Sequence, residues 1–262
     1  MLIDFDSFDA VLLDLDGTIY HEEHPLPGAV ELVRRFEAQR RKYACLTNST
    51  SSPDRIAARL QRMGIALDAH HIYTAAAATV DYVLQTFTNP RIFNLATEGI
   101  HEMLDGKVQW IEGEEDPCDA VICGVPLSIY ATDERRRVAM LHVRRGARLI
   151  GICADRVYPS PRGLEFGVGA LTAMIAYAAN VRPVFCGKPE KLFFDELCHR
   201  LGVAPGRCVL IGDNLESDIA GAKGVGMKTI LTLGGVSTRE DVERLPSAAR
   251  PDWIIDDLTK LL

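Results

Sequence analysis

A run of apolar residues near the start of the chain ends in two aspartates, a glycine and a threonine: Val11-Leu12-Leu13-Asp14-Leu15-Asp16-Gly17-Thr18-Ile19-Tyr20. The apolar part predicts a buried strand, and the polar part predicts a tight loop at the carboxyl end of that strand. An aspartate at the end of a buried strand is costly unless a cation or a hydrogen-bond donor pairs with it. The rest of the sequence therefore has to supply that partner.

The composition is that of a soluble globular protein. The 262 residues, 47% hydrophobic and 25% charged, are enough for one large domain or two ordinary ones. A net charge of −7 disfavours nucleic acid as a partner, and no apolar run approaches the ~20 residues that span a bilayer. The acidic N-terminal residues do not resemble a signal peptide, and the seven scattered cysteines form no CxxC pair. We therefore expect a cytoplasmic protein with reduced thiols and without a membrane partner.

The order of the expected elements predicts an α/β fold. Apolar runs ending at Asp14 and at Leu46 are each followed by a loop and a helix, which is typical of parallel strands with crossover helices. From about residue 75 a second set of strands and helices begins, and the first pattern returns with strands at 184–189, 209–213 and 229–233. We predict a Rossmann-like, doubly wound parallel-sheet core at residues 1–75 and 181–262. A smaller α/β cap domain, residues 76–180, would be inserted into it and cover the carboxyl ends of the core strands.

Polar side chains follow the expected core strands at the points where those strands end. They are Asp14 and Asp16, Thr47 and Asn48, Lys188, and Asp213 with Asp218. If these strands are parallel neighbours, the side chains meet at one edge of the sheet. Clustered carboxylates suit Mg²⁺, and a lysine, a hydroxyl and loop amides beside the metal suit a phosphoryl group. A carboxylate in that position could attack phosphorus and form an aspartyl-phosphate.

These motifs together resemble the haloacid dehalogenase superfamily. The matching segments are Asp-x-Asp-Gly-Thr from Asp14, the strand ending in Thr47-Asn48, Gly-Lys-Pro around Lys188, and Gly-Asp-Asn-x-x-x-Asp from Gly212. Their order is similar to that of the phosphatase branch. The large insertion between the second and third motifs resembles the NagD-like (4-nitrophenylphosphatase) group with an α/β cap. The resemblance covers nearly the whole chain.

The resemblance implies catalytic and phosphate-binding roles. Asp14 would be the nucleophile that attacks phosphorus. Asp16 would be the general acid and base, which protonates the leaving alcohol and then activates water. Thr47 and Lys188 would hold the phosphoryl oxygens, with Asn48 beside them. Because Asp16 has to carry a proton at the start, we expect crowding by other carboxylates to raise its pKa.

The resemblance also implies a Mg²⁺ cofactor. Asp14, the backbone carbonyl of Asp16, and Asp213 would be its ligands, and Asp218 would act around the metal or through Lys188. A structural interpretation of Asp218 is simpler, because an aspartate in the first turn of a helix is stabilised by the helix dipole. The presence of all four motifs favours the metal site.

Residues of the expected cap are similar to the substrate-facing loops of the group. Asp155 and Gly163 are the positions that we assign to substrate recognition. The chain departs from the usual pattern in two places: it has Cys153-Ala154 where many relatives have Asn-Pro, and Phe166 where many have proline. These departures bear on which substrate is used.

Two other polar stretches have simpler interpretations. His21-Glu22-Glu23-His24 lacks the HExxH spacing and precedes Pro25, so we predict a solvated loop. The run 112–116 is predicted to be an acidic loop, and the arginines between 135 and 145 a solvated helix face.

We predict a Mg²⁺-dependent phosphatase that hydrolyses small phosphomonoesters through an aspartyl-phosphate. By resemblance, the candidates are sugar phosphates, nucleoside monophosphates, phosphoglycolate and 4-nitrophenyl phosphate. Two other functions stay open: a phosphotransferase or mutase on the same core, and a catalytically idle regulatory binding module. A dehalogenase is disfavoured, because that chemistry requires neither Asp16 nor the metal site. A homodimer also stays open, since several relatives pair through the cap.

Overall fold

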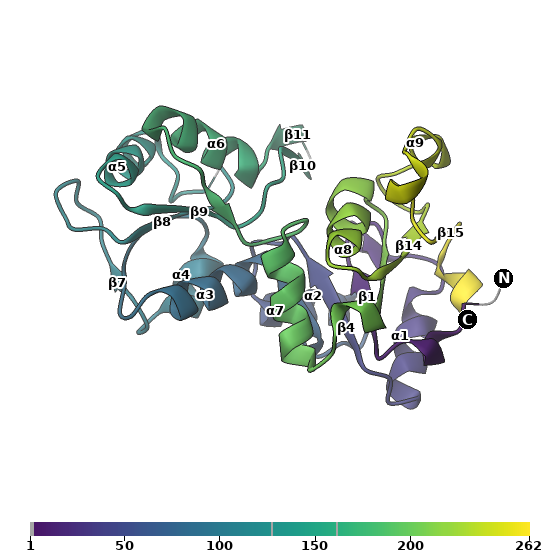
Figure 1. Cartoon of the computed structure of the whole chain (residues 1–262). Coiled ribbons are helices and arrows are strands. Elements are labelled where there is room, and N and C mark those ends of the chain that lie inside the picture. Colours follow the sequence, from purple (N-terminus) through teal and green to yellow (C-terminus); the bar gives the residue numbers. More distant parts are fainter. Residues whose placement is uncertain (1–2, 127, 161) are drawn as a thin grey trace. The chain divides into compact units, whose positions relative to one another are not determined.

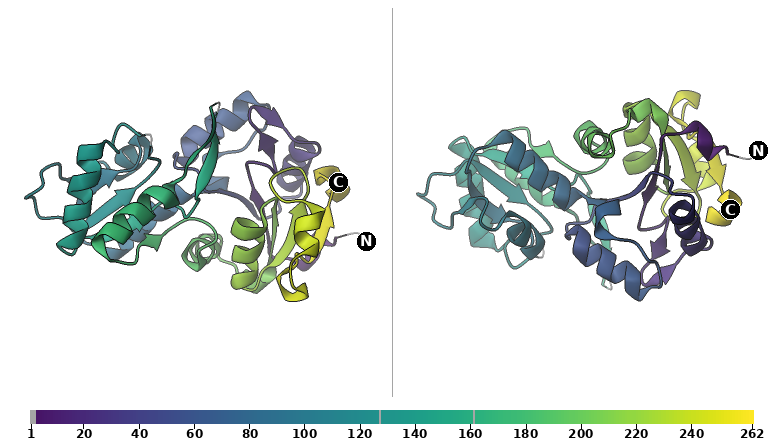
Figure 2. Two further views of the ribbon diagram at one scale, coloured as in Figure 1. Left: turned by 90° about the horizontal axis from the view of Figure 1, so that it is seen from above. Right: turned by 90° about the horizontal axis from the view of Figure 1, so that it is seen from below.

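The structure, a computed structural model, describes residues 3–126, 128–160 and 162–262 in two compact units. The core unit comprises the residues up to Thr47, Pro53–Tyr73 and Lys188–Leu262 (Figures 1 and 2). The inserted unit comprises Asn48–Ser52 and Thr74–Gly187. The domain bounds that we predicted from the sequence, residues 1–75 with 181–262 for the core and 76–180 for the cap, stay a prediction.

The core unit contains a six-stranded sheet in the order β15-β14-β13-β1-β4-β5. Its strands are β1 Ala10–Asp14, β4 Tyr43–Thr47, β5 Ile72–Thr74, β13 Cys208–Gly212, β14 Lys228–Thr232 and β15 Trp253–Ile255. β1 lies between β13 and β4 and pairs in parallel with both. Every residue of β1, β4 and β13 is buried, as expected for central strands of a parallel sheet that is covered on both faces. The predicted α/β fold with a parallel-sheet core is confirmed.

The helices of the core unit bury apolar residues. They are α1 Ala29–Ala38, α2 Pro53–Arg62, α7 Lys191–Leu201, α8 Ala220–Gly224 and α9 Arg239–Glu243. Leu32 and Phe36 of α1 and Leu60 of α2 share one core cluster with Val11 and Leu13 of β1. Short 3₁₀ turns lie at Phe5–Ser7, Ala69–His71, Pro205–Arg207, Ser247–Ala249 and Leu258–Leu261, and a π-helical turn lies at Leu215–Ile219. The stretch predicted as a loop at His21–His24 forms part of a small hairpin, β2 Tyr20–His21 and β3 His24–Pro25.

The inserted unit has its own parallel sheet, in the order β12-β9-β8-β6-β7. Its strands are β6 Arg91–Leu95, β7 Gln109–Trp110, β8 Ala120–Cys123, β9 Arg148–Gly151 and β12 Val184–Phe185. Its helices are α3 Ala75–Thr86, α4 Glu98–Leu104, α5 Asp133–Arg144 and α6 Val168–Ala179. An antiparallel hairpin, β10 Val157–Ser160 and β11 Gly163–Phe166, precedes α6. The apolar residues of α5 and α6 pack with Phe93 and Leu149 in one core.

The strand before Lys188 corrects the sequence interpretation. We counted residues 184–189 among the strands of the core sheet, and this was wrong. Val184 and Phe185 pair with Ile150 and Gly151 of β9, in the sheet of the inserted unit. A Cβ at Gly151 would lie 2.5 Å from the Phe185 ring, so the glycine makes the room that this pairing needs. A two-residue strand carries no periodicity that could have shown which sheet it joins.

The acidic loop at 112–116 is held by arginines of α5 and by Arg145, which directly follows that helix. Arg135 pairs with Glu112, Arg137 with Glu114 at 2.5 Å, and Arg145 with Glu115 at 3.0 Å. These three pairs neutralise six charges locally, and the arginines that we had predicted to be a solvated face have partners. Each exposed pair contributes only about 0–1 kcal/mol.

Two further observations concern the chain as a whole. The seven cysteines are free thiols, and six of them are buried. Among residues 3–126, 128–160 and 162–262, no helix is both long and apolar enough to cross a bilayer.

We expect His142 to make the inserted unit less stable in acid. Its ring is buried, with Nε2 3.1 Å from the carbonyl oxygen of Gly113, and burial lowers its pKa below the ordinary 6.5. The unfolded chain then binds a proton more readily than the folded one, so stability falls as the pH drops below the unfolded value. His142→Gln keeps a donor but cannot titrate. Its thermal midpoint should therefore fall less than that of the wild type between about pH 7 and pH 5. Equal losses in the two proteins would contradict this.

Candidate active site

Two carboxylates and a threonine lie at one edge of the core sheet. Asp14 is the last residue of β1, Thr47 is the last residue of β4, and Asp213 directly follows β13. The register places Asp14 beside Leu46, one residue before Thr47, and Leu13 beside Ile211. All three polar side chains are buried. The strand ends therefore meet as the sequence predicted, because parallel neighbours end at the same edge.

Lys188 lies between the carboxylates of Asp14 and Asp218. Its Nζ donates a hydrogen bond to Oδ1 of Asp14 and another, 2.6 Å long, to Oδ1 of Asp218. Burial opposes the charge of Lys188, but the two carboxylates outweigh burial and raise its pKa above the ordinary value. The lysine is therefore a cation in the interior. It is the partner that the strand-end aspartate required.

Asp14 lies in a crowded field of negative charge. Burial raises its pKa well above the ordinary value, and Asp218 and Asp213 add to the effect, which Lys188 offsets in part. A bound cation would favour the ionised form of Asp14, the form that acts as a nucleophile.

Asp213 is held in a space that two glycines leave open. A Cβ at Gly17, where φ is +84°, would lie 2.3 Å from Oδ2 of Asp213, and a Cβ at Gly235 would lie 2.0 Å from the same atom. The amide of Val236 donates a hydrogen bond of 2.7 Å to this oxygen. Burial and the charge of Asp218 raise the pKa of Asp213 to about 6. The side chain is fixed, and its charge is available to a cation.

Asp218 connects the loop after β13 to Lys188. It lies in the π-helical turn Leu215–Ile219 and is fully buried. Its Oδ2 accepts a hydrogen bond of 3.1 Å from the amide of Asn214, while Oδ1 faces Lys188. Of the two roles that the resemblance left open for Asp218, these contacts favour the one through Lys188.

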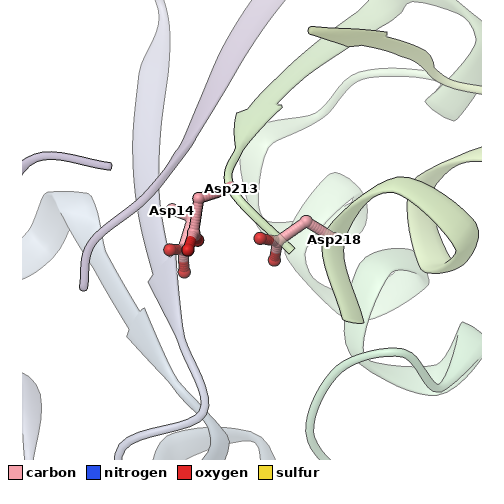
Figure 3. A group of neighbouring side chains, drawn as sticks. All are labelled: Asp14, Asp213 and Asp218. Carbon is pink, nitrogen blue, oxygen red and sulfur yellow. The ribbon is translucent and has the colours of Figure 1, made fainter. Parts of the chain in front are cut away.

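The three buried carboxylates fit a divalent cation. Asp14, Asp213 and Asp218 each offer an oxygen, and these oxygens lie within 4.8 Å of one another (Figure 3). An all-oxygen set of this kind is what Mg²⁺ prefers. The side chain of Asp16 is not in this group. A role of its backbone carbonyl as a ligand stays a prediction.

Asp16 is exposed and lies in the turn after β1. The amide of the next residue, Gly17, donates a hydrogen bond of 2.8 Å to the carbonyl of Tyr20, which closes this turn. The pKa of Asp16 is raised, as we expected, but the cause differs. Partial burial raises it, whereas His21, Arg59 and Lys188 all lower it. We had attributed the rise to other carboxylates, which is not what the structure shows.

The remaining predicted residues lie in the inserted unit. The Nδ2 of Asn48 donates to both carboxylate oxygens of Asp155, at 3.0 and 3.2 Å. These two residues line a pocket of about 240 Å³ together with Ser49, Thr50, Val125, Cys153, Tyr158, Gly167 and Val168. Gly163 begins β11, and its φ of +104° favours glycine at this hairpin position. It is exposed and does not line the pocket, and Phe166 is also exposed.

Several contributors were not predicted from the sequence. Gly235 and Val236, in the loop after β14, leave room for the Asp213 side chain and donate a hydrogen bond to it, respectively. The charges of His21 and Arg59 lower the pKa of Asp16. The only signal in the sequence was the glycine pair at 234–235 after an apolar run, which is equally typical of any turn.

Comparison with known proteins agrees with this geometry. The sequence signature described as "Haloacid dehalogenase-like hydrolase" matches residues 11–107, and one described as HAD-hydrolase-like matches residues 185–261. The chain is 31% identical to the 5'-nucleotidase YutF of Bacillus subtilis (strain 168) over 97% of both chains. The chain belongs to the haloacid dehalogenase-like hydrolase family.

Other relatives place this haloacid dehalogenase-like hydrolase in the phosphatase branch. It is 32% identical to an acid sugar phosphatase of Staphylococcus aureus (strain USA300), over 98% of this chain and 97% of that one. A 4-nitrophenylphosphatase from Thermotoga maritima matches with a TM-score of 0.89 and 28% identity, over 98% and 97% of the two chains. The predicted membership of the NagD-like group is confirmed, and the chain is an enzyme, a phosphatase of this family.

One solved relative contains the predicted metal. The glycerol phosphate phosphatase Rv1692 from Mycobacterium tuberculosis, in complex with magnesium, matches with a TM-score of 0.87 and 28% identity. The match covers the whole of this chain and 78% of that one.

Proposed function

We propose that this phosphatase hydrolyses small phosphomonoesters in a Mg²⁺-dependent reaction that passes through a phosphorylated Asp14. The observation that carries the proposal is the buried Lys188, which lies between Asp14 and Asp218 at the edge of the sheet where Thr47 and Asp213 also lie. A buried cation beside clustered carboxylates suits a phosphoryl group, whose transfer depends on positioning and on neutralised charge.

In the first half of the reaction, an oxygen of Asp14 bonds to phosphorus and the bond from phosphorus to the alcohol oxygen breaks. Lys188 and Thr47 orient the phosphoryl oxygens, and Asp16 gives its proton to the departing alcohol. The exposure of Asp16 and its raised pKa support this role, since it has to be protonated and reachable by the substrate.

In the second half, Asp16 takes a proton from water, and the water oxygen bonds to phosphorus. The bond from phosphorus to Asp14 breaks, which regenerates the carboxylate and releases inorganic phosphate. When bound by Asp14, the backbone carbonyl of Asp16, and Asp213, Mg²⁺ would supply positive charge next to the phosphoryl oxygens. Asp218 orients Lys188 through the hydrogen bond between them.

The inserted unit is proposed to act as a cap that selects the alcohol part of the substrate. Its pocket of about 240 Å³ is small and is lined both by polar side chains, such as Asn48 and Asp155, and by apolar ones, such as Val125 and Val168. The small volume supports a compact alcohol. Asp155 is proposed to shape the pocket through its contact with Asn48, and Gly163 to give the neighbouring hairpin its turn. A cytoplasmic location and a homodimer stay predictions.

We expect phosphate release to require the metal. The purified enzyme should release inorganic phosphate from at least one ester in a panel of sugar phosphates, nucleoside monophosphates, phosphoglycolate, glycerol phosphate and 4-nitrophenyl phosphate. Excess EDTA should lower the rate by at least about 10²-fold, because the carboxylate cluster then faces the phosphoryl anion unneutralised. Added Mg²⁺ should restore it.

The same assay separates the competing functions. Isomerised sugar phosphate with little free phosphate would indicate a mutase instead. The proposal fails if no ester in the panel is hydrolysed with Mg²⁺ present, or if full activity persists in EDTA.

A further inference from the structure

Asn48 lies between Asp155 and Gly187 in the inserted unit. Its Nδ2 donates to the Asp155 carboxylate at 3.0 and 3.2 Å, and the thiol of Cys153 lies 3.3 Å from the same carboxylate. On its other side the Asn48 carboxamide lies against Gly187. A Cβ placed on Gly187 would come within 2.6 Å of Oδ1 of Asn48 and 2.9 Å of the Cβ of Cys153. The carboxamide is thus confined between Asp155 and a residue that has no side chain.

The backbone around Asp155 is itself held by close packing. A Cβ on Gly167 would lie 2.2 Å from the carbonyl oxygen of Asp155, and one on Gly169 would lie 2.4 Å from that of Ala154. The amide of Gly169 also donates a hydrogen bond of 2.9 Å to the carbonyl of Asp155. The start of α6 therefore fixes the turn that directs the Asp155 carboxylate toward Asn48.

The residues of this contact adjoin two residues of the proposed phosphoryl site in the chain. Asn48 directly follows Thr47, and Gly187 directly precedes Lys188. Thr47 and Lys188 are the residues proposed to hold the phosphoryl oxygens, and both belong to the core unit. Because the trans peptide holds neighbouring Cα atoms about 3.8 Å apart, a shift of Asn48 or Gly187 is transmitted directly to the adjoining residue.

We propose that Asp155 is a positioning residue, which holds Asn48 against Gly187 and so sets where Thr47 and Lys188 lie. This inference rests on the proposed phosphoryl-binding role of Thr47 and Lys188. Asp155 then contributes to every substrate alike, through the phosphoryl group that all of them share. A carboxylate that contacted the alcohol would instead discriminate between substrates.

The test compares Asp155→Ala with Asp155→Asn. Asp155→Ala should lower kcat/KM by about tenfold to hundredfold, the usual effect of losing a hydrogen bond to a charged group, and by a similar factor for every ester. It should also raise the Kd of inorganic phosphate, measured by calorimetry with Mg²⁺ present. Asp155→Asn should recover most of both losses, because its carboxamide oxygen can still accept from Asn48. Asp133→Asn, an exposed carboxylate of the same unit paired with Arg136, is the control.

A second pair of variants tests the other side of Asn48. Gly187→Ala keeps the Asp155 side chain, but its methyl group would press on the Asn48 carboxamide and on the Cβ atoms of Ala75 and Cys153. It should therefore weaken phosphate binding as Asp155→Ala does. Gly224→Ala is the matched control, since a Cβ there meets nothing within 4 Å. This pair decides the matter if Asp155→Ala does not fold.

Two outcomes would overturn the inference. One is an unchanged Kd of phosphate in both Asp155→Ala and Gly187→Ala. The other is a loss of kcat/KM in Asp155→Ala that differs strongly between esters, which would indicate direct contact with the alcohol. Failure of the proposed function would be seen in a different measurement, namely phosphate release that persists in the Asp14→Asn variant. Phosphate binding by the Asp155 variants is measured independently of turnover.

Discussion

Asp14→Asn should lower phosphate release by at least about 10³-fold, because an amide cannot replace a carboxylate as the nucleophile. The substitution keeps the size of the side chain, and β1 around it is fully buried, so the backbone has no cause to move. It also removes one negative charge from a buried cluster, in which burial raises the pKa of Asp14 and the charges of Asp218 and Asp213 raise it further. We therefore expect the fold to survive while the reaction is lost.

The measurement is a phosphate-release assay on the best ester of the panel, with circular dichroism to show that the variant is folded. Asp256→Asn, an exposed carboxylate of the core unit that faces Arg239, is the control and should keep its activity. A folded Asp14→Asn protein with more than about a tenth of the wild-type rate would rule out the phosphorylated intermediate at this residue.

Lys188→Met should cost both activity and stability. Without the ammonium group, the Asp14 and Asp218 carboxylates lose their common partner in the interior. Removing one partner of a buried ion pair typically destabilises by about 3–5 kcal/mol, because the remaining charge is left uncompensated. The rate should fall by at least about 10³-fold, since the phosphoryl oxygens lose a fixed positive charge.

The stability loss should depend on pH in a defined direction. Loss of the cation raises the pKa of Asp14 further above its unfolded value, so the ionised carboxylate opposes folding at neutral pH. As the pH falls, Asp14 takes up a proton in the folded variant and that penalty is relieved. The difference in unfolding free energy between wild type and Lys188→Met should therefore be largest near pH 7 and smaller near pH 5, as measured by urea titration.

An exposed lysine on the adjoining helix provides the comparison for this experiment. Lys191 starts α7 and pairs with Asp195 one turn later, and its side chain is 71% exposed. Lys191→Met should change stability by no more than about 1 kcal/mol at either pH. Equal losses for the two lysine variants would mean that Lys188 is not the counter-charge of the buried carboxylates.

The central strands were predictable because burial leaves a direct trace in the sequence. β1, β4 and β13 are continuous apolar runs that end in polar residues, which is typical of parallel strands covered on both faces. The hairpin β10–β11 leaves no such trace, because its apolar residues Val157, Leu164 and Phe166 face solvent. The pairing of β12 was predicted wrongly, since it depends on Gly151 making room for Phe185.

The same distinction applies to the site. Asp14 and Asp213 could be brought together from the sequence, because each follows the end of a predicted parallel strand. The meeting of Lys188 with Asp14 was expected from the need for a counter-charge, although β12 turned out to belong to another sheet. The contact between Asn48 and Asp155 joins positions 107 residues apart. The resemblance singled out both residues, but nothing in the sequence indicated that they contact each other. Such a contact becomes visible only in the folded chain.

The five residues Asn48–Ser52 belong with the inserted unit, although they lie between two segments of the core unit in the chain. Thr97 of the inserted unit donates to the carbonyl of Thr50 at 3.1 Å, and the amide of Ala76 donates to that of Ser49 at 3.3 Å. For domain grafting, the exchangeable module is therefore discontinuous. A transplant that carries residues 74–187 into another scaffold but leaves 48–52 behind would separate segments that form one compact unit in this fold.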